Sequence, residues 1–378
     1  MNVKLMITPR DLLFFRDAKP MAAGEGYGNG CNMPTPNILH SAIRTALLRQ
    51  CGALPDRKTV STHSMDRGKN RKIGTDKFGS LQVKNLFPYH EKHGTLFQIP
   101  NDVLKADKNN LAITQLRKIS DDLICPFTTI PPCKERVSGF WTETQLLAYM
   151  SNQQDDHQQK NDFTPITQSD IWEEEWRVGI EIDTERNSTK AGQLYAGGYM
   201  RLNDCAGFVA EVSIKDDEGD LTTLNHLHFG GEKKLATVEI IQNCFPEWET
   251  TEAANGKIVK WILLTPAIFA NGALPGWIEN GKVLLQPKID GKKATIAANL
   301  LCCSVGNPKP LSGWDSIDQQ AKPSLFAVQA GAVYYFECTT KEDAKKLSAA
   351  LLAKNRSDML SEQGFGFGIT TIMEKNYE

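Results

Sequence analysis

The sequence has no long apolar run, no Cys-x-x-Cys pair and little net charge, and each of these absences argues against a class of protein. No apolar stretch in its 378 residues approaches the ~20 that a membrane-spanning helix needs. The nine cysteines are scattered without a Cys-x-x-Cys spacing, which is typical of reduced thiols in a cytoplasmic protein. A formal net charge of −2 gives no global attraction to nucleic acid, so any polyanion must meet a local basic patch.

Metal-binding and secretion signals are also missing. His90 and His93, like His226 and His228, form pairs without a third ligand at a recognisable spacing. We therefore predict neither a metal nor another cofactor. The apolar stretch at residues 3–7 is too short for a signal peptide, which again favours the cytoplasm.

What the sequence does contain is a series of strand and helix patterns. Alternating apolar residues at 3–7 predict a first strand. Thr35 and Pro36 predict the start of a helix that ends near Gly52, since Thr caps helices and Pro suits their first position. Further strands are predicted at residues 208–214, 258–264 and 332–338, and further helices at 142–150 and after the capping-box pattern at 340–343.

The length and these elements predict a two-domain α+β fold. Residues 151–170 are rich in Gln, Asn and Asp, which indicates a boundary between an N-terminal domain, 1–170, and a C-terminal domain, 171–378. The last strand, helix, glycine turn and strand form the closing half of a ferredoxin-like βαββαβ unit. We predict two ferredoxin-like domains with long loop insertions.

Three alternating glycines near the C-terminus, Gly364, Gly366 and Gly368, are separated by Phe365 and Phe367. The spacing fits neither a P-loop nor a dinucleotide fingerprint, because a strand follows it. In an extended backbone the two phenylalanines share one face and the glycines the other. We predict that the phenylalanines enter the core and the glycines leave bare backbone for RNA or a partner. A glycine bulge that shapes an edge strand is the alternative.

Several separated segments agree, in order, with one family. They are Phe14-Phe15-Arg16-Asp17, Arg177-Val178-Gly179-Ile180 with Gly192-Gln193-Leu194-Tyr195, Leu264-Thr265-Pro266-Ala267, Val333-Tyr334-Tyr335-Phe336 and the closing glycine run. In these the chain resembles the RAMP superfamily of CRISPR RNA-binding proteins, specifically the third subunit of the Cmr, or type III-B, effector complex.

The resemblance implies RNA-recognition-type ferredoxin-like domains that together hold the 5′ handle of a CRISPR RNA. It also implies contacts with the large polymerase-like subunit and the backbone RAMP subunit of the complex, with target RNA involved only indirectly. The subunit is non-catalytic in the family, and the closing glycines correspond to the glycine-rich loop of the superfamily.

Cations, main-chain amides and stacking platforms hold single-stranded RNA. Arg16, Lys19 and Tyr27 lie in or beside a glycine-rich loop, and His40 and Arg44 are neighbours on the first helix. Arg71 and Lys72 belong to a basic segment at residues 56–80. The predicted RNA-binding residues are Arg16, Lys19, Tyr27, His40, Arg44, Arg71, Lys72, Gly364, Gly366 and Gly368. For the charged residues, solvated surface positions are the alternative.

A second possible function is metal-independent cleavage of CRISPR repeats. It would need a general base near the 2′-hydroxyl, for which His40 and Tyr27 are the candidates. Phosphate binding explains the same residues without catalysis. We therefore predict no catalytic residue.

An acidic stretch predicts a contact with a protein partner. Ten acidic residues lie between Asp155 and Glu185, and three consecutive glutamates are flanked by Trp172 and Trp176. The two tryptophans are predicted to anchor a partner with a basic surface. A surface helix whose tryptophans pack inward is the alternative.

Overall fold

The computed structural model describes residues 1–16, 26–54, 77–106, 111–120, 123–131, 133, 135, 137–151, 163–183, 185–253, 255–289, 292–315, 320–375 and 377. The chain forms two compact units, each built from three separate segments. Unit 1 comprises Met1–Glu91, Ser169–Gln242 and Pro310–Leu325, and unit 2 comprises Lys92–Gln168, Asn243–Lys309 and Phe326–Glu378. Within the described residues, no helix has the length and apolarity to cross a membrane.

Unit 1 contains an antiparallel sheet with β1 (Asn2–Pro9) between β13 (Ala206–Ser213) and β15 (Leu235–Ile241). The other strands are β4 (Phe87–His90) and β3 (Gln82–Val83), both paired with β13, and β14 (His226–His228), paired with β15. Leu5 and Ile7 are fully buried, as their alternation predicts. Helix α1 (Pro36–Gln50) lies against β3 and β14.

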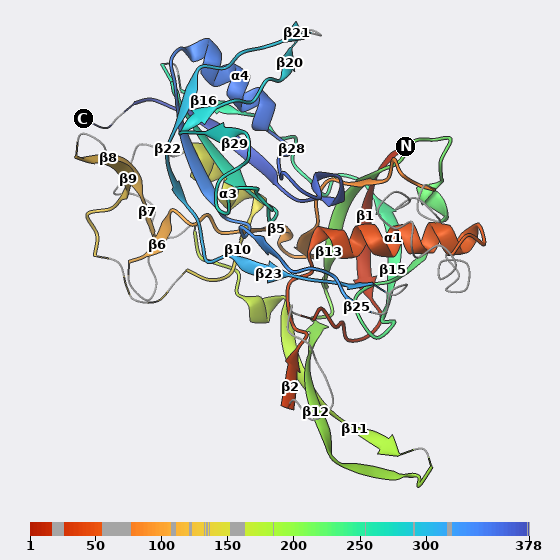
Figure 1. The fold of residues 1–378 in the computed structure, drawn as a ribbon. Coiled ribbons are helices and arrows are strands. Elements are labelled where there is room, and N and C mark those ends of the chain that lie inside the picture. Colours follow the sequence, from red (N-terminus) through yellow and green to blue (C-terminus); the bar gives the residue numbers. More distant parts are fainter. Residues whose placement is uncertain are drawn as a thin grey trace. The chain divides into compact units, whose positions relative to one another are not determined.

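A long two-stranded ribbon in unit 1 is formed by β11 (Trp172–Asp183) and β12 (Ser188–Leu202) (Figure 1). The short β2 (Gly26–Asn29) pairs in parallel with β12 along residues 195–198. This region is a strand, and many side chains of β11 are exposed. The alternative prediction of a surface helix at the tryptophans is therefore wrong.

Unit 2 is built on a second sheet in which β17 (Ile258–Leu263) lies between β29 (Phe367–Met373) and β27 (Val333–Cys338). The sheet continues through β22 (Ala298–Ser304), β19 (Lys282–Val283) and β18 (Ile278–Glu279), with β16 (Thr251–Glu252) and β28 (Lys354–Asn355) beside β29. Helix α4 (Lys341–Leu351) packs on the face that carries Trp261. Thr340 caps it, its hydroxyl accepting from the Asp343 amide at 3.1 Å.

A smaller layer in unit 2 consists of α3 (Glu143–Ser151) with β10 (Phe140–Thr142) and β5 (Gly94–Gln98). The short strands β6 (Val103–Lys105), β7 (Leu111–Ile113), β8 (Gln115–Ser120), β9 (Leu123–Phe127), β20 (Lys288–Ile289) and β21 (Lys292–Lys293) form hairpins. The remaining elements are β23 (Lys309–Leu311), β24 (Trp314–Asp315), β25 (Gln320–Ala321), β26 (Leu325–Ala327) and the 3₁₀ turns Gln168–Asp170, Leu221–Thr223 and Ser361–Gln363.

The structure confirms a strand-rich mixture of antiparallel sheets and a few helices. It differs from the predicted division at residue 170, because each unit takes residues from both sides of that position. The ferredoxin-like character of the units stays a prediction. In each main sheet one strand, β1 in unit 1 and β17 in unit 2, lies between two strands that come later in the chain. In the described residues α1 comes after β1 and β2, and α4 comes directly after β27.

Candidate nucleic-acid interface

Two phenylalanines after β1 are held tightly inside unit 1. The ring of Phe14 lies 4.8 Å from that of Tyr199, centroid to centroid. The ring of Phe15 meets Phe229 edge-on at 5.1 Å and Phe208 at 6.5 Å. These contacts fix residues 14–16, which we call the Phe14 segment and which include the exposed side chain of Arg16.

Glycines make room for this segment. A Cβ on Gly30 would lie 2.1 Å from a ring carbon of Phe14, and one on Gly230 would lie 2.8 Å from the Phe14 carbonyl oxygen. The amide of Phe15 donates to the Gly30 carbonyl at 2.7 Å, and that of Gly231 donates to the Phe14 carbonyl at 2.7 Å. The backbone that leads to Arg16 is therefore bonded on both sides.

The β11–β12 ribbon has two different faces. Because side chains alternate along a strand and paired residues share a face, even-numbered residues of β11 lie on one side and odd-numbered residues on the other. The even side carries Trp176, Val178, Ile180 and Ile182, which are 47% to 68% exposed. We call these four residues the apolar face.

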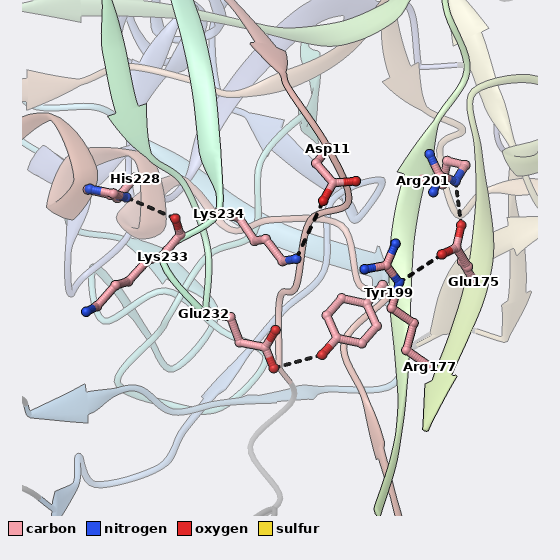
Figure 2. Close-up of polar contacts among 9 residues, drawn as sticks. All are labelled: Asp11, Glu175, Arg177, Tyr199, Arg201, His228, Glu232, Lys233 and Lys234. Atoms are coloured by element: carbon pink, nitrogen blue, oxygen red, sulfur yellow. Dashed lines mark hydrogen bonds and ion pairs between the residues drawn. The ribbon is translucent and has the colours of Figure 1, made fainter. Parts of the chain in front are cut away.

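The other side carries Glu173, which is paired with Arg201, together with Glu175, Arg177, Tyr199 and Arg201. We call the last four residues the arginine face. Glu175 accepts from Nε of Arg177 at 2.9 Å through Oε1 and from Nε of Arg201 at 2.5 Å through Oε2 (Figure 2). Both guanidinium groups are about half exposed. One carboxylate thus holds two cations side by side at the surface.

Tyr199 joins the arginine face to the Phe14 segment. Besides stacking on Phe14, its ring lies 5.9 Å from the guanidinium carbon of Arg177 and 5.3 Å from Nζ of Lys234. Its hydroxyl donates to Glu232 at 2.8 Å (Figure 2). Three cationic side chains, Arg16, Arg177 and Lys234, therefore belong to segments connected through one buried tyrosine.

The hydrogen bonds also set the protonation of this cluster. Those from Arg201 and Arg177 hold the pKa of the Glu175 carboxyl below its usual range. The same carboxylate raises the pKa of Arg201 above its ordinary value. Counted by formal charges, the triad of Glu175, Arg177 and Arg201 carries +1.

The other predicted RNA-binding residues do not gather at one place in the described structure. The backbone of Tyr27 lies in β2, in register with Ala196. Arg44 is half-buried, and its Nη2 donates to the Lys77 carbonyl at 3.1 Å. Lys19, Arg71 and Lys72 lie outside the described residues.

His40 does not lie on an open helix face as predicted. It is buried, and its Nε2 lies 3.3 Å from the Leu81 carbonyl oxygen, to which it can donate. The predicted contact with RNA requires an accessible ring, so this placement corrects it. The reason is that α1 packs its His40 side against residues near β3.

The prediction of a bare glycine face is also wrong. Phe365 and Phe367 are fully buried, as predicted, but Gly364, Gly366 and Gly368 are buried too. A Cβ on Gly366 would lie 2.2 Å from the Ser357 amide nitrogen. Gly364 and Gly366 have φ of +98° and +75°, so the run is a turn leading into β29 rather than extended backbone.

Trp172 likewise differs from its prediction. It is 3% exposed and lies in the interior, so it is no anchor for a partner. Trp176, four residues further along the same strand, is 51% exposed. The strand leaves the core between them, and only the outer tryptophan is available.

The arginine face was missed at the sequence level, and so was a buried cluster in unit 2. There Asp102 accepts from Tyr149 at 2.5 Å and from Tyr335 at 2.6 Å, and it pairs with Nζ of Lys260 at 2.7 Å. Burial lowers the pKa of Lys260, whereas it raises the pKa of both tyrosines well above the ordinary value. A lysine inside an otherwise apolar strand is the sequence signal for such a cluster.

Comparison with known proteins identifies the family. A chain in the cryo-EM structure of the Type III-B Cmr-beta bound to cognate target RNA is 14% identical, with a TM-score of 0.51 over 98% of this chain and 99% of that chain. A chain in the Type III-B Cmr-beta structure bound to cognate target RNA and AMPPnP, state 1, is 16% identical, with a TM-score of 0.49 over 88% and 86%. No curated protein matches the sequence.

At these identities the structural similarity shows the fold alone. The family comparison reaches further, because the model of the CRISPR-associated protein (Cas_Cmr3) family matches residues 5–374. That match spans nearly the whole sequence, including both units. The chain belongs to the CRISPR-associated Cas_Cmr3 family.

Proposed function

We propose that this chain is an RNA-binding subunit of a type III-B CRISPR effector complex. In this role it holds the 5′ handle of the CRISPR RNA and joins the large polymerase-like subunit to the backbone subunit, in the cytoplasm. Target RNA is reached only indirectly, through the CRISPR RNA. The family match over residues 5–374 is the observation that carries the proposal.

The surface of unit 1 supports RNA binding. The backbone of the Phe14 segment, which carries Arg16, is hydrogen-bonded on both sides. Little backbone entropy is therefore lost when the Arg16 guanidinium binds a phosphate. The arginine face adds two planar donors suited to phosphate oxygens. Lys19, Tyr27, Arg44, Arg71 and Lys72 remain candidate contacts.

The apolar face supports a contact with a protein partner. Trp176 and its three aliphatic neighbours form a continuous exposed stripe of the kind that marks interaction sites. Glu174 is exposed on the same side of β11 and favours a basic partner surface. We assign this stripe to a neighbouring subunit of the complex.

The alternative function, cleavage of CRISPR repeats, has less support. Its candidate base His40 is buried and bonded to a backbone carbonyl, whereas a general base must reach the 2′-hydroxyl. We therefore propose a binding role without catalysis.

Filter binding tests the handle. We expect the full-length chain, alone and within the assembled complex, to bind CRISPR RNA more tightly with its 5′ handle than without it. Arg16→Ala should weaken handle binding and flatten the log–log salt dependence by about 0.7, the value of one phosphate contact on single-stranded RNA. Equal affinity for the two RNAs in both preparations would reject the handle-binding role.

The nuclease alternative has its own test. The purified chain should leave repeat RNA intact in EDTA. A discrete product that disappears in His40→Ala would instead support cleavage. Product that persists both in His40→Ala and in Tyr27→Phe would point to a contaminating enzyme.

A further inference from the structure

The arginine face has an internal counter-ion at the position where a polyanion would bind. The carboxylate of Glu175 receives one Nε–H from each of Arg177 and Arg201. Each guanidinium has five N–H donors, and the Nη groups take no part in these two bonds. The two cations are therefore held together in one orientation while half of their charge is neutralised.

We propose that Arg177 and Arg201 form a binding site for one phosphodiester of single-stranded RNA, and that Glu175 is a built-in brake on its affinity. This inference rests on the proposed RNA-binding function and names one site within it. The phosphate binds the Nη edges of both guanidinium groups. Glu175 keeps the edges aligned, but its negative charge repels the incoming phosphate.

The position of the triad within the fold supports a built site. Arg177 and Arg201 come from different strands, β11 and β12, and the register of the ribbon brings them to the two sides of Glu175. The ring of Tyr199 lies under Arg177 and is itself held by Phe14 and Glu232 (Figure 2). The guanidinium groups are therefore oriented by strand pairing and ring contact rather than being free surface cations.

The formal charges predict that one substitution, Glu175→Gln, increases the affinity for RNA. Glu175→Gln removes one negative charge and so raises the formal charge of the triad from +1 to +2. The amide keeps the size of the side chain and one acceptor oxygen. We expect RNA affinity to increase by about three- to tenfold at low salt, the effect of one unit charge at about 6 Å under near-aqueous screening. The gain should shrink as salt rises.

The arginines should behave in the opposite way. Arg177→Ala and Arg201→Ala should each weaken binding and flatten the salt slope by about 0.7. Arg177→Lys and Arg201→Lys should recover only part of the loss, because lysine keeps the charge without the planar pair of donors.

The experiment measures the affinity of labelled CRISPR RNA for the full-length chain, alone and in the assembled complex, across a salt series. Glu279→Gln, an exposed acid-to-amide change on β18 of unit 2, is the matched control for net charge and should leave affinity unchanged. Thermal melting checks that each variant is folded.

The outcomes separate this inference from the proposed function. If unaltered protein binds the RNA but Glu175→Gln weakens binding or leaves it unchanged, the brake is disproved. If either alanine variant binds like the unaltered protein, or if the lysine variants recover full affinity, the two-arginine site is disproved. If unaltered protein binds no RNA in either preparation, the proposed function fails and this inference fails with it.

Discussion

At the residue scale, the closing glycines serve the packing of the core and do not form a surface for RNA or a partner. Gly366 combines a left-handed φ of +75° with a backbone contact so close that no side chain fits. Its amide donates to the Pro266 carbonyl at 2.7 Å, and its carbonyl accepts from the Arg356 amide at 2.9 Å. The glycine is needed for the packing of three chain segments.

Gly366→Ala should therefore destabilise unit 2 strongly. A left-handed non-glycine residue costs about 1–2 kcal/mol, and overpacking adds about 1–3 kcal/mol. Gly272→Ala is the matched control, since Gly272 has φ of +71° and open space where its Cβ would lie. Urea unfolding should give a clearly larger loss for Gly366→Ala, and equal losses would show that the contact with Ser357 does not matter.

At the element scale, the β11–β12 ribbon gives one strand three environments. Trp172 is in the core, Trp176 is on the exposed apolar face, and Glu175 and Arg177 are on the arginine face. Such an exposed apolar strand is an aggregation risk unless another chain covers it. This is the physical reason to expect a protein partner on that side.

The combined change Trp176→Ser and Val178→Thr should weaken assembly with the partner subunits and leave the folded chain nearly as stable as before. Exposed side chains contribute little to folding, typically within about 0.5 kcal/mol each. Size-exclusion chromatography of the reconstituted complex measures assembly. Leu284→Ser, at another exposed apolar position, is the control, and normal assembly of the double variant would remove the apolar face from the interface.

At the scale of the whole molecule, each unit is built from three segments that are separated in the sequence. Asp102 lies in the first segment of unit 2, Lys260 in the second and Tyr335 in the third, and all three meet in the buried cluster. A carboxylate between a lysine and two tyrosine hydroxyls therefore links segments that are far apart in sequence. Correct packing of unit 2 depends on all three segments being present.

Asp102→Asn should destabilise the chain more than Lys260→Met. Removing the carboxylate leaves the buried Lys260 charge uncompensated, at a cost of about 3–5 kcal/mol, whereas without the lysine Asp102 keeps two hydroxyl donors. The double variant should be less destabilised than the sum of the two changes. Denaturant unfolding of the four proteins measures this coupling, and strict additivity would mean that the ion pair is energetically silent.

Local patterns predicted a good part of the fold. The alternation at 3–7, the helix start at Pro36 and the capping box at Thr340 each correspond to an element, because these signals act within one or two turns. Thr35 does not cap its helix as predicted, since its hydroxyl donates to Oδ1 of Asn37 at 2.6 Å. The β11 strand was readable in the same way from its alternating apolar residues. The three consecutive glutamates in it instead led to the prediction of an acidic stretch that binds a partner.

The candidate site was much less accessible to sequence reasoning. Neighbouring residues and motif order were enough to predict the strand at 3–7, the helices after Thr35 and Thr340, the burial of Phe365 and Phe367, and the family resemblance. Long-range packing, by contrast, sets the burial of His40, the enclosure of the closing glycines and the position of Glu175 between the two arginines of its face. Burial and strand register depend on which distant segments meet, and β11 and β12 pair residues as far apart as 172 and 202.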